Sequence, residues 1–332
     1  MRPPLLRMFT CAILCLVAVH PARGVDGDYK EAMRVRSLLH AEELPLGAMP
    51  HARLQDPPVA ETVLLPVSRG FNQRSTGLCW AYATLSALET IHLVRTPDGP
   101  DVELSRRAVQ YYTMEDRYRR SIKQLNADIR EGGIVLDALR LIQSNGIVSF
   151  DDYADVADPY GYANIADMIA GAPTFTDRII ALYEGLDIVY TAPPTQTHVP
   201  VLSTVEPNAT YAPADAGDLA RFVLGREVWQ SYTPSSTKSG FHAHPDADAR
   251  WENVSWHMPH GEFPGRIKQA LMAGFPVVIS IRNHALLVYG ADYDAAGSPI
   301  TYYIKDSYPP YYYVTEANYL QASFWEMTTV EL

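Results

Sequence analysis

Residues 73–83, QRSTGLCWAYA, decide the fold, because they carry the chain from a polar loop into a helix at Cys79. Beyond the loop, side chains suited to one buried helix face recur with a period of 3.6 residues: Ala81, Leu85, Leu88 and His92. Residues 97–100, PDGP, contain two prolines and a glycine, which end helices. We therefore predict a helix that begins near Cys79 and stops before residue 97.

Cys79 is a candidate nucleophile. A single thiol is more often buried and inert, so its surroundings decide the interpretation. A helix N-terminus presents the positive end of the helix dipole, which stabilises the thiolate that attacks a carbonyl carbon. Gln73 lies six positions earlier on the same loop. Its side-chain amide is therefore a candidate donor to an oxyanion, beside the backbone N–H of Cys79.

The base that such a thiol needs is best placed at His284. This residue begins the run HALLVYGA, and the run ITYYIKD that follows ends at Asp306. In an antiparallel hairpin with its loop near Ala296, His284 and Asp306 lie nearly opposite each other. A carboxylate beside an imidazole fixes its tautomer and stabilises the imidazolium. The alternative is that His284 is a histidine at a strand edge, that Asp306 is a turn residue, and that neither has a catalytic role.

The first residues predict export. Arg2 and Arg7 flank an apolar run at residues 8–19, and residues 22–24, ARG, offer a cleavage site, as in a secretory signal. The run is shorter than the ~20 apolar residues that span a bilayer. We therefore expect a signal peptide at residues 1–24 and a secreted or periplasmic protein; an uncleaved anchor is the alternative. Residues 25–58 are a short propeptide or an N-terminal arm, and residues 59–332 form the main domain.

Composition narrows the partners of the mature chain. Without residues 1–24 the chain has 24 basic and 38 acidic residues, a net charge of −14. Such a charge disfavours nucleic acid or an anionic membrane as partner. Two of the three cysteines, Cys11 and Cys15, lie within residues 1–24, so Cys79 is the one that stays. An oxidising compartment favours paired cysteines, which makes a single retained thiol informative.

The order of the predicted elements indicates an α+β protein. Helices are expected first, at residues 105–120, 134–144, 176–184, 215–231 and 265–273. Strands rich in Val, Ile and Tyr follow at residues 276–281, 284–291, 300–306 and 324–332. Helices followed by antiparallel strands describe two lobes. We place a helical lobe at about 70–200, a β-lobe at about 260–332 and an irregular insertion at about 151–260.

These segments resemble the papain-like cysteine peptidases. Residues 73–83 are similar to the family's nucleophile segment, with the same Gln-to-Cys spacing and a Trp after the Cys. Residues 283–285, NHA, look like its histidine strand, and residues 302–308, YYIKDSY, like its Asn-Ser-Trp segment. Residues 103–112, 131–148 and 267–281 are similar to segments of the bleomycin-hydrolase or aminopeptidase-C-like branch. The resemblance runs from about Val63 to the C-terminus.

The resemblance implies a papain-like α+β fold of two lobes, helical and antiparallel β, with the active-site cleft between them. It implies a peptidase in which Cys79 is the nucleophile, His284 the base and Gln73 the oxyanion donor, with a peptide or protein as substrate. Asp306 stands in the position of the family's Asn and takes its orienting role. The resemblance also implies three residues that line the substrate cleft: Gly132, Gly133 and Trp80.

Departures from the family's pattern leave two further functions open. The family's Trp is Tyr308 here, and the Gly after it is Pro309. Asp306 in place of Asn keeps an acceptor for the imidazole, but acyl transferases of the transglutaminase type also use Cys, His and Asp. A catalytically silent peptidase-like binding protein is a third reading, and the presence of Cys79, His284 and Gln73 together argues against it.

A histidine-rich segment raises the question of a metal. His242 and His244 are followed by Asp246 and Asp248, and His257 lies near His260. Paired imidazoles do bind zinc. These residues lie in a polar loop, however, so we interpret the segment as a solvated insertion. We expect neither a metal nor a cofactor.

Overall fold

The computed structural model describes residues 58–74, 76–99, 101–124, 132–154, 161–190, 213, 215–232, 240–241, 258, 260–281 and 284–330. They belong to one compact unit, Pro50–Leu332. The expected signal peptide and nearly all of the expected arm or propeptide, residues 1–57, lie outside these ranges. So does most of the histidine-rich segment, residues 242–257.

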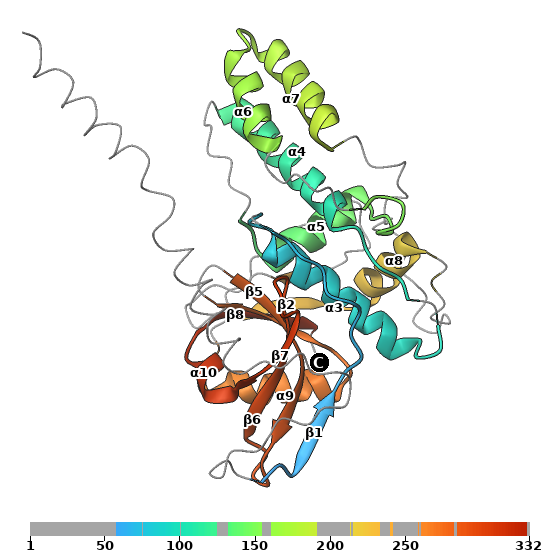
Figure 1. Ribbon diagram of the computed structural model, residues 1–332, viewed down its shortest axis with the longest axis vertical. Helices are drawn as coiled ribbons and strands as arrows, with labels where there is room; N and C mark the ends of the chain where they lie inside the picture. Colours follow the sequence, from blue (N-terminus) through green and yellow to red (C-terminus); the bar gives the residue numbers. More distant parts are fainter. Residues whose placement is uncertain are drawn as a thin grey trace, which may run out of the picture. The chain divides into compact units, whose positions relative to one another are not determined.

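The helices of the described ranges confirm the predicted order in outline (Figure 1). They are α3 Cys79–Arg95, α4 Arg106–Gln124, α5 Val135–Asn145, α6 Gly161–Gly171, α7 Phe175–Tyr190, α8 Ala216–Arg226, the 3₁₀ helix η1 His260–Glu262, α9 Phe263–Met272 and α10 Ala317–Gln321. Helix α3 begins at Cys79 and ends two residues before Pro97, as the sequence predicts. Gly146 closes α5 with a φ of 79°, a backbone conformation that L side chains rarely adopt.

The strands form one antiparallel sheet. They are β1 Glu61–Leu64, β2 Trp229–Tyr232, β3 Gly240–Phe241, β4 Val277–Ile281, β5 His284–Tyr293, β6 Pro299–Lys305, β7 Tyr312–Glu316 and β8 Phe324–Val330. The order across the sheet is β3-β2-β8-β4-β5-β6-β7, and β1 pairs with β5. The expected hairpin of β5 and β6 is present, with Leu287 opposite Lys305. Its loop turns at Gly297, whose φ is 80°.

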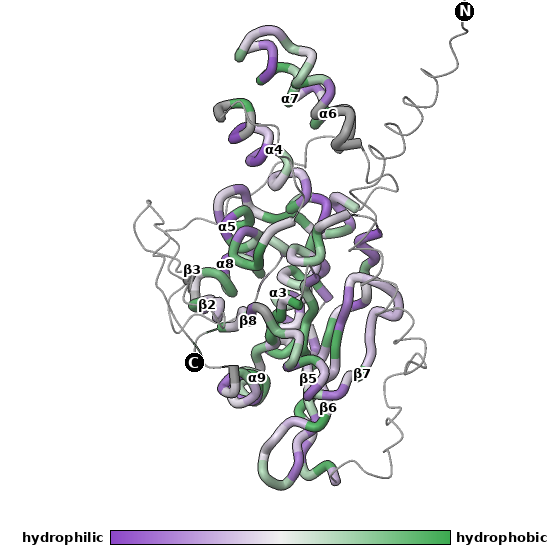
Figure 2. Tube along the Cα trace, turned by 90° about the vertical axis from the view of Figure 1, so that its left-hand side faces the viewer, coloured by the Kyte–Doolittle hydropathy of each residue, from purple (hydrophilic) through white to green (hydrophobic). Residues whose placement is uncertain are grey.

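The main core lies where α3 packs against β4 and β5. Leu85 and Leu88 of α3 are fully buried there, in one cluster with Val278, Ala285 and Leu287 of the sheet. Figure 2 shows hydrophobic stretches along both α3 and β5. Helices α4, α5 and α8 also contact α3, and α7 packs on α4 through a second apolar cluster. No helix of the described ranges is both long and apolar enough to cross a membrane.

Several expected elements need correction. The helix expected at 215–231 ends at Arg226, and its last residues belong to β2 instead. Short apolar runs do not distinguish a buried helix from a buried strand, and Trp229 is fully buried in the sheet. The segment at about 151–260 is more regular than expected, because its described residues hold α6, β2 and β3 besides the two expected helices, α7 and α8. The tyrosine-rich residues after 310 form β7, which pairs with β6.

Candidate active site

Cys79 and His284 meet because one begins a helix and the other begins the strand beneath it. Helix α3 packs on β5, and His284 is the first residue of β5. Cys79 is the first residue of α3 and is nearly buried, with 9% of its surface exposed. The two side chains are hydrogen-bonded. The first N–H groups of a helix point toward this end, so the site around the sulfur is electropositive.

Asp306 completes a hydrogen-bonded chain with these two residues. It directly follows β6, and its Oδ1 atom lies 2.8 Å from Nε2 of His284. The same oxygen accepts from the backbone N–H of Tyr308 at 3.1 Å, while the hydroxyl of Tyr313 lies 3.5 Å from Oδ2. The ring of Tyr308 lies beside the imidazole, with 5.6 Å between ring centroids. Because Nε2 faces Asp306, the other ring nitrogen, Nδ1, is left for the thiol.

The surroundings strongly favour the protonated form of His284. Burial opposes the charge, since a desolvated imidazolium is costly. The attraction and hydrogen bond of Asp306, together with the contact to Cys79, outweigh burial and raise the pKa of His284 from 6.5 to about 10. The site is therefore built to hold an imidazolium at neutral pH. An imidazolium beside a thiol stabilises the thiolate.

Gln73 is held beside the same site by the residue that follows Asp306. Its backbone N–H donates to the carbonyl of Ser307 at 3.0 Å, and the Ser307 hydroxyl donates to its Oε1. Its Nε2 donates to the carbonyl of Thr76 at 2.5 Å. That carbonyl can only accept, so the amide orientation is fixed. Arg74 next to it has a φ of 55°, an uncommon left-handed conformation that turns the loop here.

Of the three residues expected to line the cleft, two are in contact with each other. Trp80 follows Cys79 and is 2% exposed. Gly133 lies against its ring, so a Cβ built on Gly133 would stand 2.7–2.9 Å from ring atoms. Gly132 faces open space, and its carbonyl accepts a hydrogen bond from Arg117. Substrate binding by these three residues stays a prediction.

Replacing Gly133 with alanine is expected to displace the indole of Trp80 and with it the start of α3. A contact under 3.0 Å with a buried ring forces movement, and overpacking of this kind costs about 1–3 kcal/mol. We expect a lower melting temperature together with a lower kcat/KM. Gly132→Ala is the matched control for stability, because nothing lies within 4 Å of its added Cβ. Equal changes in the melting temperature of the two variants would contradict the expectation.

Several polar residues at the site were missed by the sequence reasoning. Ser307 lies in residues 302–308, which were assigned by resemblance as a segment, and Tyr313 lies just beyond them. A second group, Ser68, Glu89, Arg106 and Lys305, forms a buried cluster beside α3. The sequence does single out Glu89, because it is the one acidic residue between Cys79 and Val94 on the predicted helix. Within the described residues, no group of three or more His, Cys, Asp or Glu side chains is arranged to hold a metal.

The comparisons with known proteins give no relatives by sequence. No protein-family model matches the chain, and no curated protein matches it. Solved structures do match. The chain is similar to a solved structure that concerns antibody cross-reactivity between the mite allergens Blo t 1 and Der p 1, with 15% identity over 93% of this chain and 78% of the matched chain, at a TM-score of 0.41. It is also similar to procathepsin L 3 of the larval midgut of Tenebrio molitor, with 15% identity over 90% and 79%, at a TM-score of 0.40.

The similarity that establishes the fold is the one to the crystal structure of PepW from Lactobacillus rhamnosis HN001. It covers 82% of each chain, with a TM-score of 0.52 and 14% identity. Identity at this level establishes the fold alone. Helices packed on an antiparallel sheet, with Cys79 and His284 at their junction, define the fold of this chain as papain-like, α+β with two lobes.

Proposed function

We propose that the protein is a cysteine peptidase that cleaves peptide bonds through an acyl-enzyme on Cys79. The observation that carries the proposal is the hydrogen-bonded chain from Cys79 through His284 to Asp306, at the junction of α3 and β5. A nucleophile, a base and an orienting carboxylate in contact are the parts that acyl transfer by a thiol requires. Export, as the N-terminal sequence predicts, is part of the same proposal.

Each residue has a distinct role in the proposed reaction. The Cys79 thiolate attacks the carbonyl carbon of the substrate, and the oxygen becomes an oxyanion. The backbone N–H of Cys79 and the side-chain amide of Gln73 stabilise that oxyanion; the amide nitrogen carries two hydrogens, and the bond to Thr76 uses one. The His284 imidazolium then donates its proton to the leaving amine. Water, deprotonated by His284, then attacks the thioester, releases the carboxylic acid and restores the Cys79 thiolate and the His284 imidazolium.

The first test of the proposal joins labelling with product analysis. Iodoacetamide should alkylate Cys79 rapidly at neutral pH and abolish activity in proportion to the label. The purified protein, incubated with a mixture of peptides, should yield fragments that mass spectrometry identifies as hydrolysis products. If a primary amine were incorporated into the peptides without cleavage, the Cys-His-Asp arrangement would belong to an acyl transferase. If Cys79 reacted no faster than a small free thiol, neither reaction would be supported.

Gln73→Ala is expected to lower kcat by roughly 10²–10³ with little change in KM, as for the loss of one oxyanion donor. The measurement is steady-state kinetics on a cleaved peptide. Ser307→Ala is the matched control, because it removes the hydroxyl that bonds Oε1 of Gln73 and leaves the amide donor in place. We expect the control to change kcat only slightly. If Ser307→Ala lowered kcat as much as Gln73→Ala does, the role of Gln73 would be to stabilise the loop and not to bind the oxyanion.

A further inference from the structure

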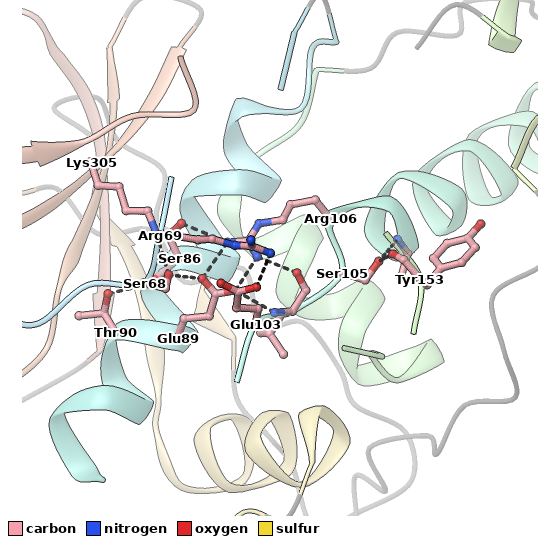
Figure 3. Close-up of polar contacts among 12 residues, drawn as sticks. Ser68, Arg69, Ser86, Glu89, Thr90, Glu103, Ser105, Arg106, Tyr153 and Lys305 are labelled. Atoms are coloured by element: carbon pink, nitrogen blue, oxygen red, sulfur yellow. Dashed lines mark hydrogen bonds and ion pairs between the residues drawn. The ribbon is translucent and has the colours of Figure 1, made fainter. Parts of the chain in front are cut away.

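A cluster of charged side chains is buried between α3, α4 and the sheet (Figure 3). Glu89 of α3 is 0% exposed and Arg106 of α4 is 1% exposed. The guanidinium donates to both carboxylate oxygens, at 2.5 Å and 2.7 Å. The Glu89 carboxylate also accepts from the backbone N–H of Leu104 at 2.8 Å and from the hydroxyl of Ser68 at 2.5 Å. Glu89 and Arg106 are therefore a neutral and well-bonded pair by themselves.

Lys305 adds a second cation to this neutral pair. The side chain is 4% exposed, and its Nζ donates to the Ser68 hydroxyl at 2.7 Å. Ser68 thus accepts from Lys305 and donates to Glu89, which links the ammonium to the carboxylate. Burial, to which Arg106 adds, lowers the pKa of Lys305 to about 7 against the attraction of Glu89 and Glu103. A cation that is costly to bury is hard to explain by its contribution to stability.

The ends of the cluster lie next to the catalytic groups. Lys305 is the last residue of β6, and Asp306 follows it. The Lys305 side chain donates to Ser68, and Asp306, the next residue, bonds His284. Glu89 lies on the same helix as Cys79, ten residues further along. Lys305, Ser68 and Glu89 therefore tie the end of β6 to the helix that carries the nucleophile.

A small pocket lies between α3 and the end of β6. Its lining includes Tyr82 and Ser86 on the helix side and Lys305, Asp306 and Ser307 on the strand side. A strand end that borders a cavity has fewer packing contacts to fix it. The polar link through Ser68 spans the same two elements and supplies that restraint.

We propose that Lys305 is a positioning residue, which acts through Ser68 and Glu89 to hold Asp306 and His284 in place against Cys79. This inference rests on the proposed function of Cys79 and His284. A displacement of about 1 Å at a catalytic group costs up to roughly 10²-fold in rate. Loss of the link is therefore expected to lower kcat far more than it lowers stability.

Lys305→Met is the test variant, because methionine is unbranched and apolar and leaves the neutral pair of Glu89 and Arg106 bonded. We expect kcat to fall roughly 10- to 100-fold with KM nearly unchanged, while the melting temperature is not lowered. The rate of Cys79 alkylation below pH 7 should fall with kcat, since the imidazolium is then less well placed beside the sulfur. Lys268→Met is the control, because Lys268 of α9 pairs with Glu61 of β1 at 2.7 Å and takes no part in the buried cluster.

A second variant covers the case in which Lys305→Met does not fold. Ser68→Ala keeps both charges and removes the hydroxyl that links them, so it should lower kcat and alkylation in the same way. Suppose instead that the variant that folds shows a normal kcat and a normal alkylation profile, and only its melting temperature is lowered. The cluster would then serve stability alone, and the inference would be overturned. If wild-type Cys79 itself showed no enhanced alkylation below pH 7, the proposed function would fail, and the inference with it.

Discussion

Cys79→Ala is expected to abolish turnover, with a loss of kcat on the order of 10⁶, as when a catalytic nucleophile is removed. The Ser307 hydroxyl at the same site is bonded to Oε1 of Gln73 and is a far weaker acid than a thiol. The fold should persist, because the change removes one sulfur atom from a helix start and costs ~1 kcal/mol of unfolding free energy. The measurements are single-turnover and steady-state cleavage of a peptide, together with thermal unfolding of the same preparation.

Two further variants make this result specific. Cys79→Ser keeps the size and the hydrogen-bonding capacity, yet it should be nearly as inactive, because a serine hydroxyl is a far weaker acid than a thiol. Thr84→Val changes a fully buried position on the same helix, where a hydroxyl bonds the carbonyl of Trp80, and should retain activity. Appreciable turnover by Cys79→Ala, or its failure to fold while Thr84→Val folds, would remove Cys79 from the role of nucleophile.

Replacing Asp306 should separate charge from hydrogen bonding. Attraction to Asp306 contributes to the raised pKa of His284, and the imidazolium is lost only as the pH rises through about 10. Asp306→Asn keeps an acceptor, so it should retain most activity near neutral pH. The alkaline limb of its kcat/KM profile should move down by about 1–3 pH units, the usual effect of one opposite charge at this distance. Asp306→Ala removes the acceptor too and should cost roughly 10³–10⁴ in kcat.

The measurement is the pH profile of kcat/KM for the wild type and both variants. Tyr313→Phe is the control, because it removes the hydroxyl 3.5 Å from Oδ2 and leaves the charge of Asp306. Its alkaline limb should stay close to that of the wild type. If the Asn and Ala variants behaved alike, or if neither moved the limb, another residue near His284 would have to orient the imidazole.

The pairing of His284 with Asp306 shows how far local patterns reach. The hairpin was predictable, because two runs of β-forming residues flank a loop with Gly297 and Pro299. Opposite positions in a hairpin follow from the loop, so the proximity of the two side chains was predictable as well. The strand pairing has irregularities next to Val288 and Asp292, and each of them shifts the register by one residue. Such shifts depend on backbone packing and have no signal in the run of residues.

The helix expected at 215–231 shows where local patterns fail. Its start was predictable, since the Asp215 side chain caps α8 by accepting from the backbone N–H of Asp218. Its end was not, because Trp229 continues the apolar pattern and yet pairs with Val330 at the far end of the chain. The choice between helix and strand was made there by a partner about one hundred residues away.

The sequence by itself determined the start of the helix at Cys79, the hairpin that carries His284 and Asp306, and the α+β class. These features depend on periodicity, turn residues and spacing, which act over a few neighbouring residues. The tertiary structure alone decided the strand order, the fixed orientation of the Gln73 amide and the buried link from Lys305 through Ser68 to Glu89. Ser68 and Lys305 are separated by 237 positions. A hydrogen bond over that separation exists only because the packing of α3 on the sheet excludes water and brings both ends together.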